Sequence, residues 1–428
     1  MTKRLLLTLS FAVFSMTANA EEPTVRVRLF QSVPSVTMDF AGAWTLTGGD
    51  SVSGTVELHP QGEQIRLVRA EHADEIVPAP LDFTPTETSS TVTIRKIPYG
   101  VGWWWEAKQD RDYSSQLTFR VLEGDVMQGV ATMRLEKYLQ GVVPSEIGPD
   151  SPLEALKTQA VAARSETVRA LKSRIYAGPD YDICADVECQ AYSGDTKRSA
   201  ASDRAIAETK SLVLTHKGEV IGAYYASNSG GMTENVENVW PERSGPAPYW
   251  SGQYDGDPAE APKLTDEESV RRWIDSSPEV FSNPKYHPGM PDWAKKNFRW
   301  ERQFKVDDLS ARLSEKHPIG RFLRIEPLKR GVSGRIARAR IVGTEGSFEV
   351  DRELALRKLF DPPLRSSCFY VETIGPADAP TEIRIVGAGY GHGVGMCQTG
   401  AICRAIAGQD FRTILTHYYR ETEIVPAY

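Results

Sequence analysis

An α+β fold is expected for this chain of 428 residues. It would be elongated, with a β-rich N-terminal sheet or small barrel, a central helix–turn–helix and a mixed, β-rich C-terminal part lining a groove. Alternating apolar and polar residues fill much of the first 130 positions, as in half-buried strands. The apolar spacing then changes to the helical period. Twenty-seven prolines and 34 glycines indicate many turns.

The first 20 residues have the composition of a secretory signal peptide. Lys3 and Arg4 precede an apolar run over residues 5–16, which is too short to span a bilayer. Residues 18–20, Ala-Asn-Ala, have the pattern of a cleavage site. We expect export with cleavage after Ala20; an uncleaved anchor is the alternative. No later stretch reaches 18 apolar residues, so we expect no membrane insertion after cleavage.

Composition limits the classes of partner. Hydrophobic residues make up 40% and charged residues 25% of the chain, as in globular proteins, and the length allows roughly two to three domains. The formal net charge is −7 and becomes −9 without Lys3 and Arg4. An acidic chain without a run of basic residues is a poor partner for nucleic acid.

Residues 24–130 form the predicted N-terminal β-rich region. Its segments of period-two alternation are 24–30, 52–58, 64–68, 91–95 and 117–121. A Trp103-Trp104-Trp105 cluster follows two glycines. Three adjacent indoles cannot all face one way on a strand. We favour a core plug with a hydrogen-bonded indole; the alternative is a rim position suited to stacking on sugars.

Residues 131–240 are predicted to hold the helix–turn–helix. An apolar helical face begins at Leu135, and Pro144 is expected to end that helix at or near Val143. A second helix is expected from Ser151, as its cap, to about Leu171.

Glu146 stands on the predicted turn between these helices. The apolar faces on both sides favour partial burial of its carboxyl group. Burial disfavours the anion and raises the pKa, as a general acid near neutral pH requires. The alternative is an acid that simply faces water.

The remaining chain divides into two predicted segments. Residues 241–300 are a Pro-, Asp- and Trp-rich excursion with one short helix near 267–274. Residues 301–428 are a mixed region, with helices at 306–313 and 351–359. Its predicted strands are 325–328, 336–342, 347–350, 369–374 and 382–386.

A glycine-rich loop in the last segment surrounds His392. Five glycines lie between positions 387 and 395, where backbone must approach another group closely or adopt positive φ. The loop lacks the Gly-Lys-Ser/Thr ending of a P-loop and the spacing of a dinucleotide fingerprint, so no nucleotide cofactor is expected. Either it presents His392 and Gln398 to a site, or it is a tight structural loop.

The five cysteines are too few for a disulfide scaffold. Cys184 and Cys189 could form a short-loop disulfide, contribute half of a zinc site, or stay free. Cys397 and Cys403 could pair with each other or with Cys368. No cysteine has the pattern of a catalytic nucleophile.

Several motifs together resemble the stage II sporulation protein D family, also called the amidase-enhancer family. They are the run from Leu135 to Arg164, Gln190-x-Tyr192-x-Gly194, Tyr224-Tyr-Ala-Ser-x-Ser-Gly-Gly231 and Gly389-x-Gly-His-Gly-Val-Gly-Met-x-Gln-x-Gly-Ala401. They occur in the family's order and cover most of residues 130–420.

The resemblance implies that peptidoglycan glycan strands are the substrate. Sporulation members are lytic transglycosylases that cut strands lacking stem peptides, whereas other members activate a cell-wall amidase. The essential acid of the sporulation members corresponds to Glu146. Some members bind zinc through one His and two Cys, but Gly178 occupies the place of that His, which favours a disulfide and no metal.

These observations predict an exported peptidoglycan lytic transglycosylase, periplasmic or extracellular, with Glu146 as acid/base. It would cleave the MurNAc–GlcNAc bond and leave a 1,6-anhydro product. The alternative is a non-catalytic wall-binding protein that stimulates an amidase. The expected groove-lining residues are Gln190, Tyr192, Ser227, Ser229, His392 and Gln398.

Overall fold

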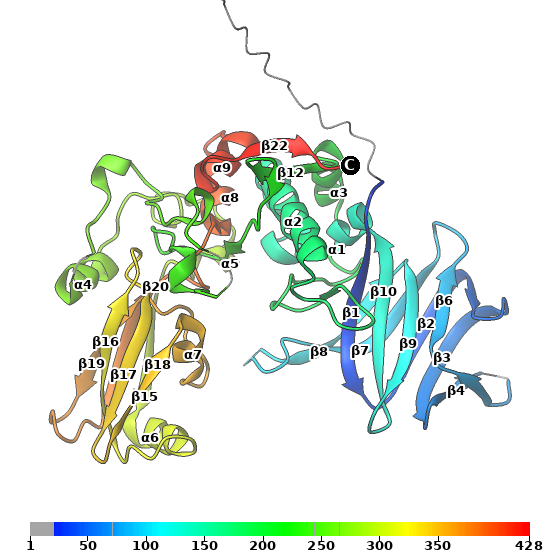
Figure 1. Cartoon of the computed structure of the whole chain (residues 1–428), viewed down its shortest axis with the longest axis horizontal. Helices are drawn as coiled ribbons and strands as arrows, with labels where there is room; N and C mark the ends of the chain where they lie inside the picture. Colours follow the sequence, from blue (N-terminus) through cyan, green and yellow to red (C-terminus); the bar gives the residue numbers. More distant parts are fainter. Residues whose placement is uncertain (1–20, 71, 104, 243–244, 265) are drawn as a thin grey trace, which may run out of the picture.

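The computed structural model describes residues 21–70, 72–103, 105–242, 245–264 and 266–428. The predicted signal peptide and Trp104 lie outside these ranges. The expected α+β fold is confirmed: a sheet formed by the first part of the chain leads into central helices, and the C-terminal part combines further small sheets with helices (Figure 1).

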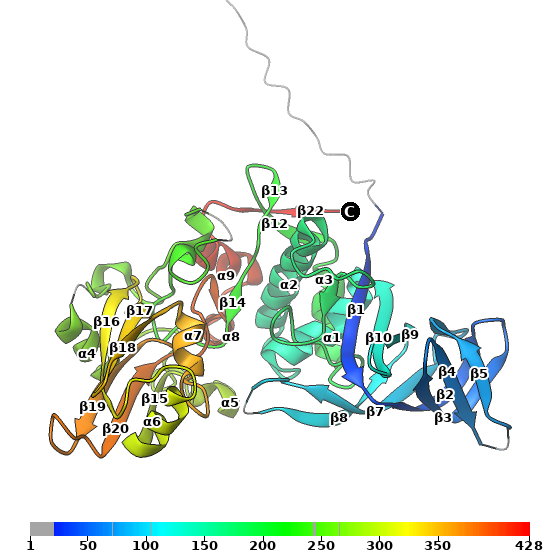
Figure 2. The same ribbon diagram turned by 60° about the horizontal axis from the view of Figure 1, so that its bottom comes forward.

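The N-terminal region forms a sheet rather than a closed barrel. Its main path runs in the order β11-β1-β10-β9-β6-β2-β3-β4-β5, and β7 and β8 branch from β2. The strands are β1 (Thr24–Val33), β2 (Val36–Leu46), β3 (Ser51–Gln61), β4 (Gln64–Arg69), β5 (Glu75–Pro78), β6 (Leu81–Pro85), β7 (Thr91–Tyr99), β8 (Ala107–Tyr113), β9 (Gln116–Leu122), β10 (Val126–Arg134) and β11 (Ile183–Cys184). The β7–β8 hairpin projects from the sheet toward the C-terminal part (Figures 1 and 2).

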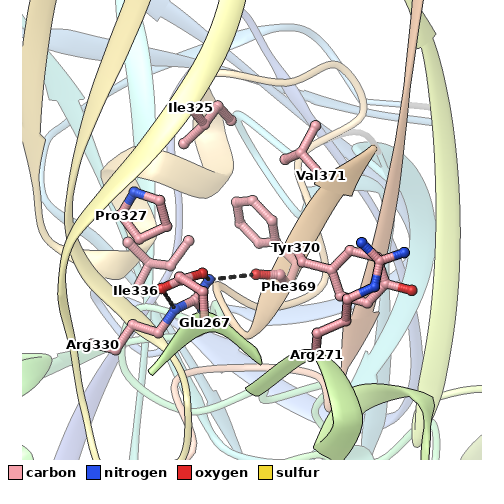
Figure 3. Close-up of a pocket in the computed structure, with 9 residues that line it drawn as sticks. All are labelled: Glu267, Arg271, Ile325, Pro327, Arg330, Ile336, Phe369, Tyr370 and Val371. Carbon is pink, nitrogen blue, oxygen red and sulfur yellow. Dashed lines mark hydrogen bonds and ion pairs between the residues drawn. The ribbon is translucent and has the colours of Figure 1, made fainter. Parts of the chain in front are cut away.

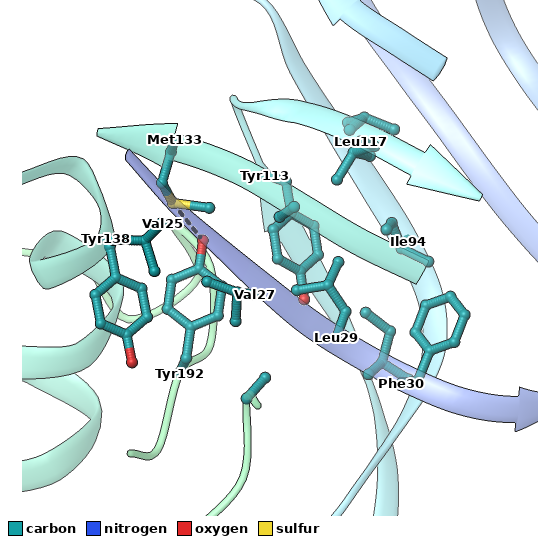
Figure 4. Packing of buried hydrophobic residues seen from close by; sticks show 14 of the residues in the cluster. Val25, Val27, Leu29, Phe30, Ile94, Tyr113, Leu117, Met133, Tyr138 and Tyr192 are labelled. Atoms are coloured by element: carbon teal, nitrogen blue, oxygen red, sulfur yellow. Dashed lines mark hydrogen bonds between the residues drawn. The ribbon is translucent and has the colours of Figure 1, made fainter. Parts of the chain in front are cut away.

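Three helices pack next to this sheet: α1 (Leu135–Ile147), α2 (Leu153–Ser173) and α3 (Ala200–Glu208). One apolar core joins the sheet to them, because the alternating side chains of β1 and β10 meet the buried face of α1. Tyr138 and Tyr192 stack within this core, with ring centroids 5.2 Å apart, and Tyr113 lies beside them (Figure 4).

The prediction that Pro144 ends the first helix is wrong. Pro144 lies inside α1, which continues to Ile147. A proline removes one helical hydrogen bond. Here the helix continues across that gap, with its apolar face buried and the Ser145 hydroxyl donating to the Gly141 carbonyl at 2.7 Å. Glu146 therefore stands in the last turn of a helix, not on a free turn.

The predicted capping role of Ser151 is also wrong. The Ser151 hydroxyl donates to the carbonyl of Ile147 at 2.6 Å, so it caps the end of α1, and Pro152 occupies the N-cap position of α2 without a side-chain bond. Because one side chain closes the end of α1 immediately before α2, the two helices are fixed to each other next to Glu146.

The C-terminal part consists of small sheets and short helices. Its small sheets have the orders β13-β12-β22, β14-β21, β15-β20-β19 and β16-β17-β18. The strands are β12 (Leu212–His216), β13 (Glu219–Val220), β14 (Tyr225–Ala226), β15 (Arg299–Lys305), β16 (Phe322–Arg330), β17 (Ile336–Gly343), β18 (Ser347–Asp351), β19 (Phe369–Ile374), β20 (Glu382–Ala388), β21 (Met396–Cys397) and β22 (Glu423–Pro426). The helices are α4 (Glu267–Asp275), α5 (Asp292–Lys295), α6 (Val306–Ser314), α7 (Glu353–Lys358), α8 (Gln398–Ile406) and α9 (Phe411–Tyr418).

The last helices return to the centre of the molecule. Helices α8 and α9 pack on α2, and β22 pairs with β12. The excursion over residues 241–300 is attached there through Asp255, which is fully buried. Its carboxylate accepts from the Arg404 guanidinium at 2.8 Å and from the Tyr418 hydroxyl at 3.0 Å. Among the described residues, no helix is long and apolar enough to cross a membrane.

Candidate active site

A groove with a volume of about 690 Å³ lies where the central helices, the β7–β8 hairpin and the C-terminal part meet. Its walls come from segments far apart in the sequence. The charged residues that line it are Glu146, Glu166, Glu188, Arg352, Glu353, Arg357 and Lys358. The aromatic residues that line it are Trp103, Trp105, Tyr176, Tyr224, Tyr225, Trp240, Tyr390 and His392.

Glu146 is held at the wall of this groove by the loop that follows the cysteine pair. The backbone N–H of Ala191 donates to its Oε1 at 2.6 Å. The amide of Gln398, from the first turn of α8, donates to the backbone carbonyl of Glu146 at 3.2 Å. These two bonds position both the carboxyl group and the end of α1 that carries it.

Burial raises the pKa of Glu146 from 4.5 to about 7. The hydrogen bond from Ala191 and the side chains of Gln398 and Tyr225 oppose this rise without cancelling it. A carboxylate in the last turn of a helix also faces the negative end of the helix dipole, which disfavours the anion further. A substantial fraction of Glu146 is therefore protonated near neutral pH, as an acid catalyst requires.

Gln190 lies behind the groove wall and links it to the core. Its Oε1 accepts hydrogen bonds from Tyr138, at 3.1 Å, and from Thr167, at 2.8 Å. Its Nε2 donates to the Tyr225 hydroxyl at 3.0 Å and to the Ala163 carbonyl at 3.3 Å. Because the Tyr225 oxygen accepts this bond, the hydroxyl proton of Tyr225 points toward another group. The Tyr225 side chain also lies close enough to Glu146 to lower the pKa of that carboxyl group.

His392 lines the groove, but its ring is engaged with the backbone. The Val394 N–H donates to Nδ1 at 3.0 Å, so the lone pair of Nδ1 is used. Nε2 lies 3.0 Å from the carbonyl of Tyr225 and therefore carries the proton. The Trp240 ring packs against the imidazole, with centroids 4.7 Å apart. Both ring nitrogens thus face backbone groups, and the ring shapes the groove wall.

The other predicted site residues separate into two groups. Ser227 lines the groove, and its Oγ accepts from the Asn297 amide at 3.0 Å. Ser229 is buried behind the wall, where its hydroxyl accepts from the Gly231 N–H at 3.2 Å. Tyr192 belongs to the core under the sheet, where its hydroxyl contacts the Met133 sulfur. The structure thus brings Glu146, Ser227, His392 and Gln398 to one groove, with Gln190, Tyr192 and Ser229 outside its lining.

The core-plug interpretation of the tryptophan cluster is wrong for the two indoles that the structure describes. Trp103 and Trp105 are only partly buried and stack on each other, with centroids 4.8 Å apart. Both line the groove, so the rim position is the one observed. The N–H of Val101 donates to Asp186 at 3.3 Å and ties this hairpin to the loop of the cysteine pair.

Cys184 and Cys189 form a disulfide, which decides among the three predicted alternatives. Cys189 lines the groove, so the bond closes the loop that leads to Ala191 and its contact with Glu146. Cys368, Cys397 and Cys403 are buried free thiols, so the suggested pairings among them are wrong. The described residues contain no group of three or more His, Cys, Asp and Glu arranged to hold a metal ion.

The glycine-rich loop is shaped by a buried arginine. Arg335 is 2% exposed and donates to the carbonyls of Ser229, at 3.3 Å, and Gly391, at 3.4 Å. A Cβ at Gly389 would lie 2.9 Å from this guanidinium, and one at Gly393 would lie 2.5 Å from it. Both glycines also have positive φ, of 78° and 82°. The glycines therefore leave room for Arg335, which holds the wall next to His392.

A second, smaller cavity of about 290 Å³ lies on the C-terminal part, between α4 and the edge strands β16 and β19 (Figure 3). Its lining combines apolar side chains with the charged side chains of Glu267, Arg271 and Arg330. At its rim the Arg330 guanidinium makes two 2.6 Å bonds to Glu267 and a 3.0 Å bond to the Phe369 carbonyl. None of the predicted site residues lies in this cavity, so the groove at Glu146 is the stronger candidate.

Sequence reasoning missed several residues of the groove. Tyr225 and Glu166 belong to motifs or helices that were recognised, but their orientation toward the groove depends on tertiary packing. The residues of α7 carry no motif. For Trp103 and Trp105 the sequence signal was the pair of glycines that precedes the cluster. It is compatible with a position at a rim, where aromatic side chains that stack on sugars commonly lie.

Comparison with known proteins identifies two matching regions. Residues 123–216 match the family described as Stage II sporulation protein, and residues 234–395 match a Domain of unknown function (DUF8618). The first region contains α1, α2 and Glu146; the second contains the whole excursion, α7 and His392.

Three relatives span most of this chain. The chain is 29% identical to Stage II sporulation protein D of Bacillus subtilis over 315 residues, which cover 70% of this chain and 77% of that protein. It is 29% identical to an uncharacterized protein of Brachyspira hyodysenteriae over 314 residues, 73% of this chain and 72% of that one. It is 28% identical to the Amidase enhancer of Bacillus subtilis over 305 residues, 67% of this chain but only 40% of that protein. The expected resemblance to the stage II sporulation protein D and amidase-enhancer family is therefore confirmed, and the family model itself covers residues 123–216.

Proposed function

We propose that this protein is an exported peptidoglycan lytic transglycosylase with Glu146 as its acid/base. The observation that carries the proposal is the position of Glu146 at the wall of a groove of about 690 Å³, where burial raises the pKa of its carboxyl group to about 7. A cell-wall role is also supported by the names of the relatives, one a sporulation protein and one an amidase enhancer.

The reaction needs only one carboxyl group. Protonated Glu146 gives its proton to the glycosidic oxygen between MurNAc and GlcNAc, and the bond from that oxygen to C1 of MurNAc breaks as positive charge develops on the ring. The resulting carboxylate then takes the proton of the MurNAc C6 hydroxyl while O6 bonds to C1. The products are a 1,6-anhydro end and a free GlcNAc end; no water is consumed, and Glu146 is protonated again.

The groove also provides groups suited to holding a glycan. Indole and phenol rings offer apolar faces and edges for sugar C–H groups, and the amide and hydroxyl groups of Gln398 and Ser227 can bond to sugar hydroxyls. His392 and Tyr225 position the wall around the acid. We also propose the periplasm or cell exterior as the location, in keeping with the Cys184–Cys189 disulfide.

The second candidate function is stimulation of a cell-wall amidase without catalysis by this chain. The observation that favours it is the relative named Amidase enhancer. In this case the groove would bind glycan strands, and Glu146 would contribute to binding rather than to bond cleavage.

The test is digestion of purified glycan strands in ¹⁸O-labelled water by the wild type, Glu146→Gln and Glu188→Gln. The products are then identified by mass spectrometry. Glu188 lines the same groove and is exposed, so its variant is the matched control. We expect unlabelled anhydro products from the wild type and Glu188→Gln, and none from Glu146→Gln.

Other results would contradict the transglycosylase. Products carrying one ¹⁸O atom would show hydrolysis, in which another carboxylate of the groove, such as Glu166, would be the base that activates water. No product from any of the three proteins, combined with equal stimulation of an amidase, would support the second function.

A further inference from the structure

The positively charged side chains that line the groove differ in whether they form an ion pair. Arg357 is buried and pairs with Glu353 at 3.4 Å, and Arg352 pairs with Glu242 at 3.1 Å. Lys358, at the end of α7, also lines the groove and is exposed. Within the described ranges, no carboxylate lies within salt-bridge distance of its ammonium group.

The Lys358 ammonium is nevertheless held in a defined place. It lies 4.9 Å from the centroid of the Trp103 ring, which stacks in turn on Trp105. A cation over an indole is attracted by the ring's negative face. The groove lining also includes the carboxyl groups of Glu146 and Glu166. The groove thus combines acidic side chains with a cation positioned beside an aromatic surface.

We propose that Lys358, together with Trp103 and Trp105, forms a subsite that binds the free lactyl carboxylate of a MurNAc unit. This rests on the proposed function, because it assumes that a glycan strand occupies the groove. GlcNAc units are neutral, whereas each MurNAc unit without a stem peptide carries one carboxylate. An ammonium group that is paired with no carboxylate among the described residues is suited to that anion, and the indoles are suited to the sugar ring beside it.

The subsite gives the groove a means of selecting strands. A stem peptide converts the lactyl carboxylate into an amide and so removes the charge that Lys358 binds. The spacing between Lys358 and Glu146 would also set which MurNAc unit stands at the acid when another occupies the subsite. Because the ammonium is partly solvated, its loss should weaken binding by about three- to tenfold rather than abolish it.

The experiment measures binding without turnover, in the Glu146→Gln protein. The probes are a peptide-free GlcNAc–MurNAc tetrasaccharide, the same oligosaccharide with its lactyl groups amidated, and chitotetraose. The affinity for each probe is measured by titration calorimetry at low and at high salt. Lys358→Gln is compared with Lys358→Arg, which keeps the charge, and with Lys329→Gln, a change on β16 outside the groove lining.

We expect Lys358→Gln to weaken binding of the peptide-free tetrasaccharide about three- to tenfold, with no change for the two uncharged probes. Lys358→Arg and Lys329→Gln should retain most of the affinity, and salt should reduce the preference. Equal affinities of Lys358→Gln and its parent for the acidic tetrasaccharide would overturn the subsite, as would an equal loss for all three probes.

The subsite and the proposed function can fail separately. If Lys358 discriminates the lactyl carboxylate but the wild type forms no anhydro product, the subsite stands and the transglycosylase does not. If anhydro products form while Lys358→Gln binds and cuts like the wild type, the transglycosylase stands and the subsite does not. If the groove binds none of the three probes, both are overturned.

Discussion

Replacing Glu146 by glutamine should make the protein more stable at high pH but not at low pH. The folded protein holds this carboxyl group with a pKa of about 7, against 4.5 for an unperturbed group. Below about pH 4.5 the group is protonated in both the folded and the unfolded chain. As the pH rises, the unfolded chain loses the proton first and is thereby stabilised relative to the folded one.

The size of the effect follows from the two pKa values. A tenfold change in an equilibrium corresponds to about 1.4 kcal/mol, so the wild type should lose up to about 3 kcal/mol of unfolding free energy between pH 4 and pH 8 through this group. Most of the loss falls between the two pKa values. Glutamine has no such titration and keeps an Oε1 for the Ala191 N–H.

The measurement is urea unfolding of the wild type and Glu146→Gln at several pH values, with Glu188→Gln as a control. We expect the Glu146→Gln advantage to grow by about 2 to 3 kcal/mol from pH 4 to pH 8, a range that allows for the partial exposure of the side chain. A stability difference that stays constant with pH would refute a raised pKa. It would also remove the main support for an acid catalyst.

Three further changes test how the groove is built. Replacing Cys184 and Cys189 by serine should cost about 2 kcal/mol of stability, because a short loop is no longer closed in the unfolded chain; differential scanning calorimetry measures this. Gly393→Ala should destabilise the protein by more than 2 kcal/mol, since it adds a clash to an unfavourable φ, whereas Gly218→Ala, at a φ of 80° with open space around it, should cost only about 1 kcal/mol. Asp255→Ala should cost about 3 to 5 kcal/mol, because it leaves a buried guanidinium without its carboxylate.

Each of these expectations has a clear opposite. Unchanged melting of the serine double variant would mean that the loop is held by its other contacts. Equal costs at the two glycine positions would mean that the arginine can move away from the added methyl group. Wild-type stability of the aspartate variant would show that the excursion does not depend on its buried ion pair.

Local elements of this fold could be predicted because their signals are local. The strand predicted at 369–374 has those bounds in the structure, and the short helix of the excursion appears at Glu267–Asp275. Alternation and helical spacing are properties of a few neighbouring residues, so no distant contact is needed to interpret them.

The misjudged features depend on contacts that the sequence does not display. Pro144 remains inside α1, whose length is stabilised by burial of its apolar face against the sheet. Ser151 binds the preceding helix instead of capping the next one. The part-buried position of Glu146 could be predicted because the apolar faces of two adjacent helices lie on either side of it. By contrast, the approach of Trp103 and Lys358 to the same groove results from packing between distant parts of the chain.

The contact between Gln398 and the end of α1 has a consequence for the order of events during folding. The two bonded residues are 252 positions apart, and Ser227 and His392 reach the same groove from other distant segments. Contacts between such distant positions form late, because long loops must close first. The sheet and the first helices can therefore form while the groove is still incomplete. The groove, and any activity that depends on it, would therefore be complete only in the last step of folding.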